Sequence, residues 1–185
     1  MNKIIKSFVL VFAVALFFIS NSCDKFDTFP LNVPFSIDVS TSGNSNPTDA
    51  NPVTYCLTQS QTYQDYVNDI VKLTFIEAAW RTTSVNNITK GNVTVTLKIL
   101  GGATLFEKTL NDINPSDYIK PKAPYVLSLT ATEIDLLNKY LETYRANPQN
   151  APCLQASVAA FVTSGNPPYS LVGIVDMVVE AETNL

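Results

Sequence analysis

The sequence has 185 residues, of which 46% are hydrophobic and 15% are charged, with 16 acidic against 12 basic residues. Its apolar content excludes an intrinsically disordered chain, and its length fits one domain with a hydrophobic core. The absence of histidine excludes Ser-His-Asp and Cys-His catalytic sets and the commonest zinc sites.

Residues 1–22 have the features of a secretory signal peptide. Lys3 and Lys6 form a basic start, and the apolar run from Phe8 to Ile19 follows. A helix that spans a bilayer needs about 20 apolar residues, so this shorter run indicates a signal sequence rather than a permanent membrane span.

The leader ends in Ser20-Asn-Ser-Cys23, which resembles the lipobox of bacterial lipoproteins. The usual motif has Leu three positions before the cysteine and Ala or Gly directly before it, whereas this chain has serine at both positions. The resemblance implies that residues 1–22 are removed and that Cys23 is acylated. The alternative is an ordinary secreted protein that is cleaved near Ser22.

The cysteine count bears on this choice, because three is an odd number for an exported chain. Acylation of Cys23 would leave Cys56 and Cys153, which we expect to form a disulfide in an oxidising compartment. The alternative is a pair of buried thiols that pack as small apolar side chains.

The charge of the mature domain separates two ways of reaching a membrane. Without Lys3 and Lys6, ten basic residues remain against 16 acidic ones, which gives a formal net charge of −6. An acidic domain without a basic cluster disfavours nucleic acid and anionic lipid as partners, so the membrane is reached through the N-terminal lipid. Residues 23–28 are then a short tether, and residues 29–185 form a single domain close to its membrane.

The first half of the domain alternates strand and loop signals. Residues 31–40 alternate apolar and polar side chains, and Pro34 favours an edge position for this strand. Residues 41–52 predict a mobile polar loop, and residues 59–69 predict a helix in which Thr62 and Asp65 have capping-box spacing. Residues 71–80 are apolar on both faces, which is typical of a central strand.

The second half begins with a hairpin, in which residues 92–99 and 104–110 flank Gly101-Gly102. A short strand is expected at residues 125–129. The clearest helix follows, with Thr130 and Glu133 as a capping box and Asn147-Pro148 as its stop. Strands at residues 153–162 and 170–181 are joined by a turn that contains Gly165-Asn-Pro-Pro168.

Some seven strands with one or two short helices in the connections predict an all-β fold, an immunoglobulin-like antiparallel β-sandwich. The order of elements is similar to that of small bacterial envelope lipoproteins: a leader that ends in cysteine, a Tyr-rich segment, a capped helix at residues 129–136 and a last strand at residues 175–182. This resemblance implies a lipid-anchored protein of the Gram-negative cell envelope, at the outer membrane. Asp24 leaves inner-membrane retention open, because it acts as a retention signal in some of these bacteria.

The residues that could carry chemistry are mainly acidic. Asp176, Glu180 and Glu182 project to one side of the last strand, and paired carboxylates about 5–10 Å apart can act as a glycosidase pair. The alternative is the solvated face of an antiparallel strand. The loops at residues 44–51 and 166–169, which include Tyr169, are candidates for recognition. Aromatic side chains could stack on sugars or pack in the core: Tyr55, Tyr63, Tyr66, Trp80, Tyr118, Tyr125 and Tyr169.

These patterns favour a non-catalytic lipoprotein that acts as a structural or partner-binding module. The sequence has neither a phosphate-binding loop nor a calcium-loop motif, so we expect no cofactor. A lipoprotein that binds carbohydrate or another small ligand is the first alternative, and an envelope protein or a glycan is the expected partner. The second alternative is a hydrolase that uses Asp176 with Glu180 or Glu182.

Overall fold

A computed structural model describes residues 28–184, so the predicted leader and residues 23–27 of the predicted tether, Cys23 included, lie outside the described residues. The described chain is mostly antiparallel β-structure with two α-helices and two short 3-10 helices. The strands are β1 (Thr28–Gly43), β2 (Asp49–Asn51), β3 (Val53–Tyr55), β4 (Ile70–Ile99), β5 (Thr104–Ile113), β6 (Tyr125–Val126) and β7 (Leu154–Asn184). The helices are η1 (Leu57–Gln59), α2 (Gln61–Tyr66), η2 (Pro115–Tyr118) and α3 (Ala131–Ala146).

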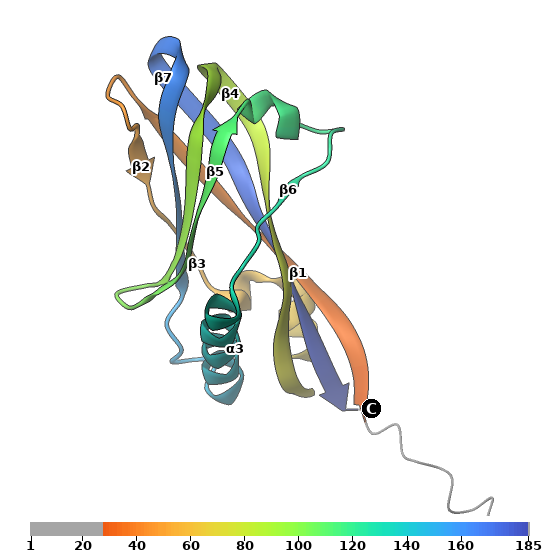
Figure 1. The fold of residues 1–185 in the computed structure, drawn as a ribbon. Helices are drawn as coiled ribbons and strands as arrows, with labels where there is room; N and C mark the ends of the chain where they lie inside the picture. The colour runs from red at the N-terminus through yellow and green to blue at the C-terminus, as the bar shows by residue number, and fades with distance from the viewer. Residues whose placement is uncertain (1–27, 185) are drawn as a thin grey trace, which may run out of the picture.

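Two long strands, β4 and β7, form the backbone of the fold. They pair antiparallel from Ile70 opposite Thr183 to Ile99 opposite Leu154. Both strands bend at one level, near Asn87 and Gly165, so the ribbon that they form folds over on itself (Figure 1). Gly165 permits this bend, because a Cβ there would lie 2.0 Å from the carbonyl oxygen of Asn87.

The bend creates two layers that share β4 and β7. The first layer contains β2, β1, residues 170–184 of β7, residues 70–86 of β4, and β6. The second layer contains β3, residues 154–162 of β7, residues 91–99 of β4, and β5. The prediction of an antiparallel β-sandwich with short helices in the connections is confirmed. The sequence predicted separate strands where β4 and β7 each run through both layers.

The core lies between the layers and is built by the alternation visible in the sequence. Val33, Ile37 and Val39 of β1 are buried against the inward residues of β7, such as Val175 and Val179. Phe35 is buried on the same side of the strand, whereas Pro34, Ser36 and Asp38 stay on the surface. The alternation of residues 31–40 is therefore confirmed, and so is the edge position, because β2 pairs only with residues 40–42 of β1.

Helix α3 fills the space at one end of the sandwich, below the second layer in Figure 1. Its capping box is present, with Thr130 accepting from the backbone N–H of Glu133 and Glu133 accepting from that of Thr130. Asn138 Oδ1 accepts a hydrogen bond of 2.8 Å from the backbone N–H of Phe75. This bond gives a partner to one backbone donor of β4. The apolar side of the helix is buried: Leu137, Tyr140, Leu141 and Tyr144. The helix prediction is confirmed.

Two local predictions are confirmed only in part. Residues 41–52 are polar but folded back on the sandwich: Thr48 is buried, its N–H donates to the carbonyl of Ala160, and its hydroxyl accepts from the N–H of Ala160. Helix α2 is shorter than predicted, and Ser60 caps it in place of Thr62. In both cases long-range contacts with β7 or the core decide between local alternatives of similar stability.

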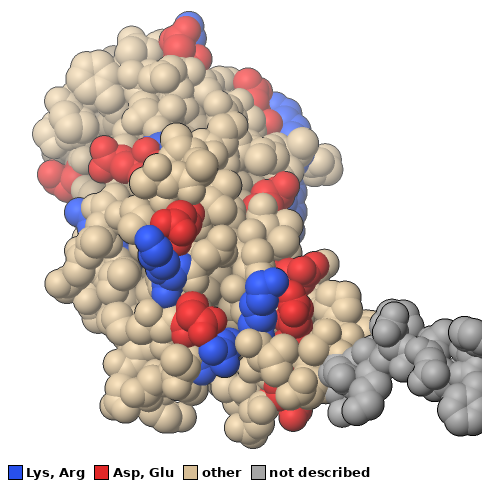
Figure 2. Space-filling view, turned by 60° about the horizontal axis from the view of Figure 1, so that its bottom comes forward, with Lys and Arg blue, Asp and Glu red and all other residues tan. Residues whose placement is uncertain are grey.

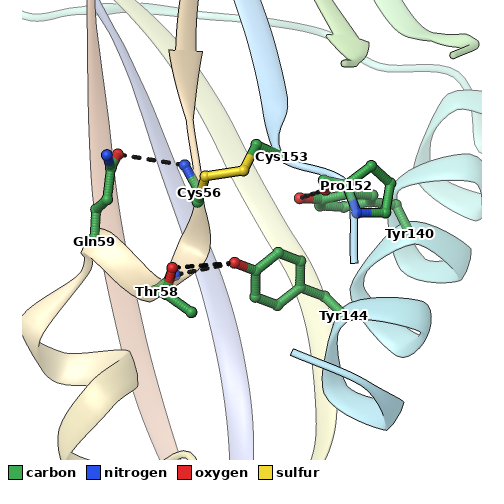
Figure 3. The surroundings of a disulfide bond; sticks show 7 residues. All are labelled: Cys56, Thr58, Gln59, Tyr140, Tyr144, Pro152 and Cys153. Carbon is green, nitrogen blue, oxygen red and sulfur yellow. Dashed lines mark hydrogen bonds between the residues drawn. A yellow bond between two sulfur atoms is a disulfide. The ribbon is translucent and has the colours of Figure 1, made fainter. Parts of the chain in front are cut away.

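The predicted disulfide is present. Cys56, directly before η1, is bonded to Cys153, directly before β7, and the two residues are 97 positions apart (Figure 3). Hydrogen bonds support the same junction, because Tyr140 donates its hydroxyl proton to the carbonyl of Pro152 and Tyr144 accepts from the N–H of Thr58. The bond therefore ties the α2 region to α3 and the start of β7.

Candidate functional site

The candidate carboxylates lie on the outward side of the first layer, which we call the outer face. On β7 this face carries every second residue from Val172 to Glu182, because the intervening residues point into the core. Asp176, Glu180 and Glu182 therefore share one face, as the sequence predicted. Val178 separates Asp176 from Glu180 along the strand.

Asp176 is held by the strands on both sides of β7. Ser36 Oγ on β1 donates to Asp176 Oδ1 at 2.6 Å, and Arg81 Nε on β4 lies 3.4 Å from Oδ2. The side chains of Arg81 and Asp176 are 19% and 32% exposed, so the pair is only partly open to solvent. Cross-strand pairing accounts for the position of Asp176.

Glu182 is paired in the same way at the end of the strand. Its Oε1 accepts a hydrogen bond of 2.6 Å from Lys72 Nζ. This hydrogen bond raises the pKa of Lys72, and the negative charge of Glu180 raises it further. Glu180 stands opposite Asn32 of β1 and Thr74 of β4. The charges at this end of the outer face thus form a small network around one lysine.

Tyr169 is not near the carboxylates. It lies at the bend of β7, opposite Gly43, and its ring is half-buried against the core. It belongs with the loop that follows Gly43 at the end of the sandwich away from Glu182 (Figure 1). The structure therefore brings three of the four weak candidates onto one face and leaves the fourth at the far end.

The outer face is hollowed beside the Arg81–Asp176 pair. A shallow hollow of about 240 Å³ lies where the segment after η2 runs beside β4, at a parallel bridge between Thr82 and Ile119. Two cationic side chains, two threonines and two isoleucines line it: Arg81, Thr82, Thr83, Ile119, Lys120 and Ile174. We call it the Arg81 hollow.

Sequence reasoning did not find the Arg81 hollow. Its residues come from β4, β7 and the loop after η2, which are distant in the chain. The one available signal was Arg81, a charged residue directly after the apolar residues Ala78, Ala79 and Trp80. The Thr82 hydroxyl accepts from Trp80 Nε1 at 3.2 Å, so its own proton can be donated elsewhere.

A second hollow of about 400 Å³ lies near the disulfide. It is formed between α2 and the segment that follows α3, and it is lined by Thr58, Tyr63, Gln64, Val67, Pro148 and Gln149. Neither hollow contains a candidate carboxylate, and Asp176 only borders the first.

The aromatic candidates divide between core and surface. Trp80 and Tyr63 are buried, and burial raises the pKa of Tyr63 to about 12. Tyr55, Tyr118, Tyr125 and Tyr169 are half-buried, and Tyr66 is the exposed ring of the set at 43%. Trp80 and Tyr63 thus belong to the core, as one of the two interpretations expected.

Charged side chains are interspersed on the face drawn in Figure 2, where basic and acidic groups lie next to each other. The ion pairs within residues 28–184 include Lys108 with Glu133 and Lys139 with Asp135. Within residues 28–184, no three acidic or cysteine side chains come close enough to hold a metal ion. None of the helices in that range has the length and apolar character needed to cross a bilayer.

Comparison with known proteins gives weak structural similarities, including the following two. A chain of the Desmodium yellow mottle tymovirus structure matches with 11% identity over 85% of this chain and 89% of that chain, at a TM-score of 0.40. A chain of the mud crab tombus-like virus structure matches with 13% identity over 94% and 98%, at a TM-score of 0.33. These TM-scores are too low to support a fold or a function. No family model and no curated protein sequence matches the chain.

Proposed function

We propose that this chain is a lipid-anchored protein of the bacterial cell envelope that binds a partner and has no catalytic role. The observation that carries the proposal is the place where the sandwich begins. Strand β1 starts at Thr28, five positions after Cys23, and pairs there with Asn184 at the end of β7. A lipid on Cys23 would therefore hold this one end of the molecule, which we call the anchor end.

The Arg81 hollow is well placed for a partner in such an orientation. Ile174 lies ten positions before Asn184 on β7, which corresponds to roughly 30 Å along a strand. A partner that is not embedded in the membrane can reach a surface at that height. The lining of the Arg81 hollow is apolar and cationic, which favours binding over catalysis. The carboxylate of Asp176, which borders the hollow, is already engaged by Ser36 and Arg81.

The anchor is tested by mass spectrometry of the mature amino terminus. We expect cleavage before Cys23 and the added mass of acyl chains, with the protein in the membrane fraction. The matched variant Cys23→Ser should move to the soluble fraction. An unmodified Cys23, or cleavage elsewhere, would return the protein to the secreted class, and separation of inner from outer membranes assigns the compartment.

Partner binding is tested by photo-crosslinking in intact cells. A photoreactive residue replaces Thr83 in the Arg81 hollow, and the matched control replaces Thr109, an exposed threonine on the outward side of the second layer. We expect a discrete crosslinked protein from position 83 that position 109 does not give. Equal patterns from both positions would contradict binding at the outer face, and a glycan in place of a protein would favour the carbohydrate-binding alternative.

A further inference from the structure

The anchor end carries two exposed aromatic rings from different elements. Phe29 on β1 is 56% exposed and Tyr66 on α2 is 43% exposed. A chain of hydrogen bonds places both at the same end: the N–H of Asp69 donates to the carbonyl of Tyr66, and the N–H of Asn184 donates to the carbonyl of Asp69. Asn184 pairs with Thr28, the neighbour of Phe29.

Neither ring contributes to the core. Position 66 follows the buried Tyr63 on a short helix, and Tyr63 alone of the two packs against Tyr144. Phe29 lies near the start of β1, before Val33, the first buried residue of that strand. The carbonyl oxygen of Phe29 accepts a hydrogen bond of 3.1 Å from Thr183 Oγ1. Exposed aromatic rings lose apolar contact with water when they enter the boundary of a bilayer, and tyrosine keeps its hydroxyl hydrated there.

We propose that the anchor end rests on the bilayer surface, with the rings of Phe29 and Tyr66 in the headgroup region. This inference rests on the proposed lipid at Cys23. Five extended residues reach about 18 Å at most, so the tether keeps both rings close to the membrane at all times. The tether raises the local concentration of lipid around a surface whose own affinity is weak.

The charges at this end select the kind of lipid surface. Asp65 and Asp69 are exposed beside Tyr66, and Lys72 is already paired with Glu182. Carboxylates repel anionic headgroups, so the anchor end fits a surface of zwitterionic lipid such as phosphatidylcholine or phosphatidylethanolamine.

The test uses the acylated full-length mature protein in phosphatidylcholine vesicles. Benzoylphenylalanine replaces Phe29, Tyr66 or, as the matched control, Phe161, which is 49% exposed on the second layer near the bend. After illumination, mass spectrometry measures lipid crosslinked at each position. We expect about tenfold more crosslinked lipid at positions 29 and 66 than at position 161. A factor of about ten corresponds to the free energy gained when one aromatic ring is partly buried. Similar yields at 66 and 161 would overturn the proposal.

A longer tether separates resting on the membrane from mere proximity. With a flexible Gly/Ser insert of about ten residues after Asp24, a domain that is only tethered moves away from the bilayer, whereas a seated domain stays. We expect the crosslink at position 66 to persist with the insert and to fall when Phe29→Ser is added. Loss of the crosslink with the insert alone would overturn the proposal.

The lipid composition provides the last arm of the test. Added phosphatidylglycerol should lower the yield at position 66, and an increase would overturn the assignment to a zwitterionic surface. The mass of the same sample shows whether Cys23 is acylated. Protein without acyl chains means that the proposed anchor has failed, whereas acylated protein with equal yields at 66 and 161 contradicts this inference alone.

Discussion

Gly173 lies where the first layer packs most closely. A Cβ at this position would stand 2.1 Å from Cη2 of Trp80, which is fully buried, and 2.6 Å from the carbonyl oxygen of Arg81. The indole ring cannot shift far enough to relieve this overlap without displacing its neighbours, because the core is closely packed. The glycine therefore fixes the position of Trp80 and, through it, the strand that carries Arg81.

We expect Gly173→Ala to lower the free energy of unfolding by about 1–3 kcal/mol, the usual cost of overpacking a core. Trp80→Phe removes the ring atoms that the new methyl group would meet. The double variant should therefore lose less than the sum of the two single losses. Denaturant unfolding of the four proteins measures this coupling, and strictly additive losses would contradict the packing described.

Glu133 joins the cap of α3 to strand β5. Its carboxylate accepts from the N–H and hydroxyl of Thr130 at 2.7 and 2.8 Å and from Lys108 Nζ at 2.5 Å. Burial acts to raise its pKa, but these hydrogen bonds together hold the pKa below the ordinary value of 4.5. A depressed pKa means that the stabilisation is present above 4.5 and is lost as the pH falls through the folded value.

We expect Glu133→Gln to lower the stability by about 1 kcal/mol at neutral pH, the usual value of a helix cap. The difference from the wild type should shrink between about pH 5 and pH 3, because the wild-type carboxylate is then protonated. Asp135→Asn is the control, since its side chain is 60% exposed on the same helix. Unfolding curves across this range measure the effect, and parallel pH profiles would contradict it.

At the scale of an element, β1 leaves one long edge of the sheet open. Among the described residues, β2 covers only residues 40–42 of this edge, while the ladder to β7 continues through Pro30 and Pro34 without a register shift. The two proline nitrogens therefore face the open edge, where they remove donors that another strand would need.

We expect the double change Pro30→Val and Pro34→Val to promote self-association, because it restores two donors to the open edge. Asn32→Val is the matched control, since it adds a branched side chain between the prolines without adding a donor. Sedimentation velocity of the Cys23→Ser protein compares them. A double variant that stays as monomeric as the control would show that the prolines do not protect this edge.

At the scale of the whole molecule, the disulfide closes the end of the ladder between β3 and β7, because Cys56 and Cys153 directly adjoin the paired residues Tyr55 and Leu154. Cys56 precedes the small helices, and Cys153 precedes the strand that enters the second layer, with 97 positions between them. Closing so long a loop restricts the unfolded chain more than the folded one.

We expect reduction, or the change of Cys56 and Cys153 to serine, to lower the stability by about 4–5 kcal/mol in the loop-closure model. Denaturant unfolding of oxidised and reduced protein measures the loss. Thiol labelling of denatured, unreduced protein verifies the bond, and two reactive thiols within the mature domain would contradict it.

Local pattern was sufficient for much of the fold because burial on one face leaves a visible period. The alternation in β1, the capping box of α3 and the hairpin between β4 and β5 each follow from a few neighbouring residues. The same reasoning placed Asp176, Glu180 and Glu182 on one face, and the pairing of Cys56 with Cys153 followed from cysteine count. Position along a period, however, says nothing about which strand lies beside it.

Tertiary structure alone decided the rest. The fold-over of β4 and β7 depends on contacts between Asn87 and Gly165, and the return of residues 44–48 depends on hydrogen bonds to β7. The Arg81 hollow exists because the segment after η2 lies beside β4 at Thr82. Each of these features joins residues that are distant in the chain. The sequence by itself determined the elements and the faces that they bury, whereas only long-range packing determined the surfaces that a partner or a membrane would meet.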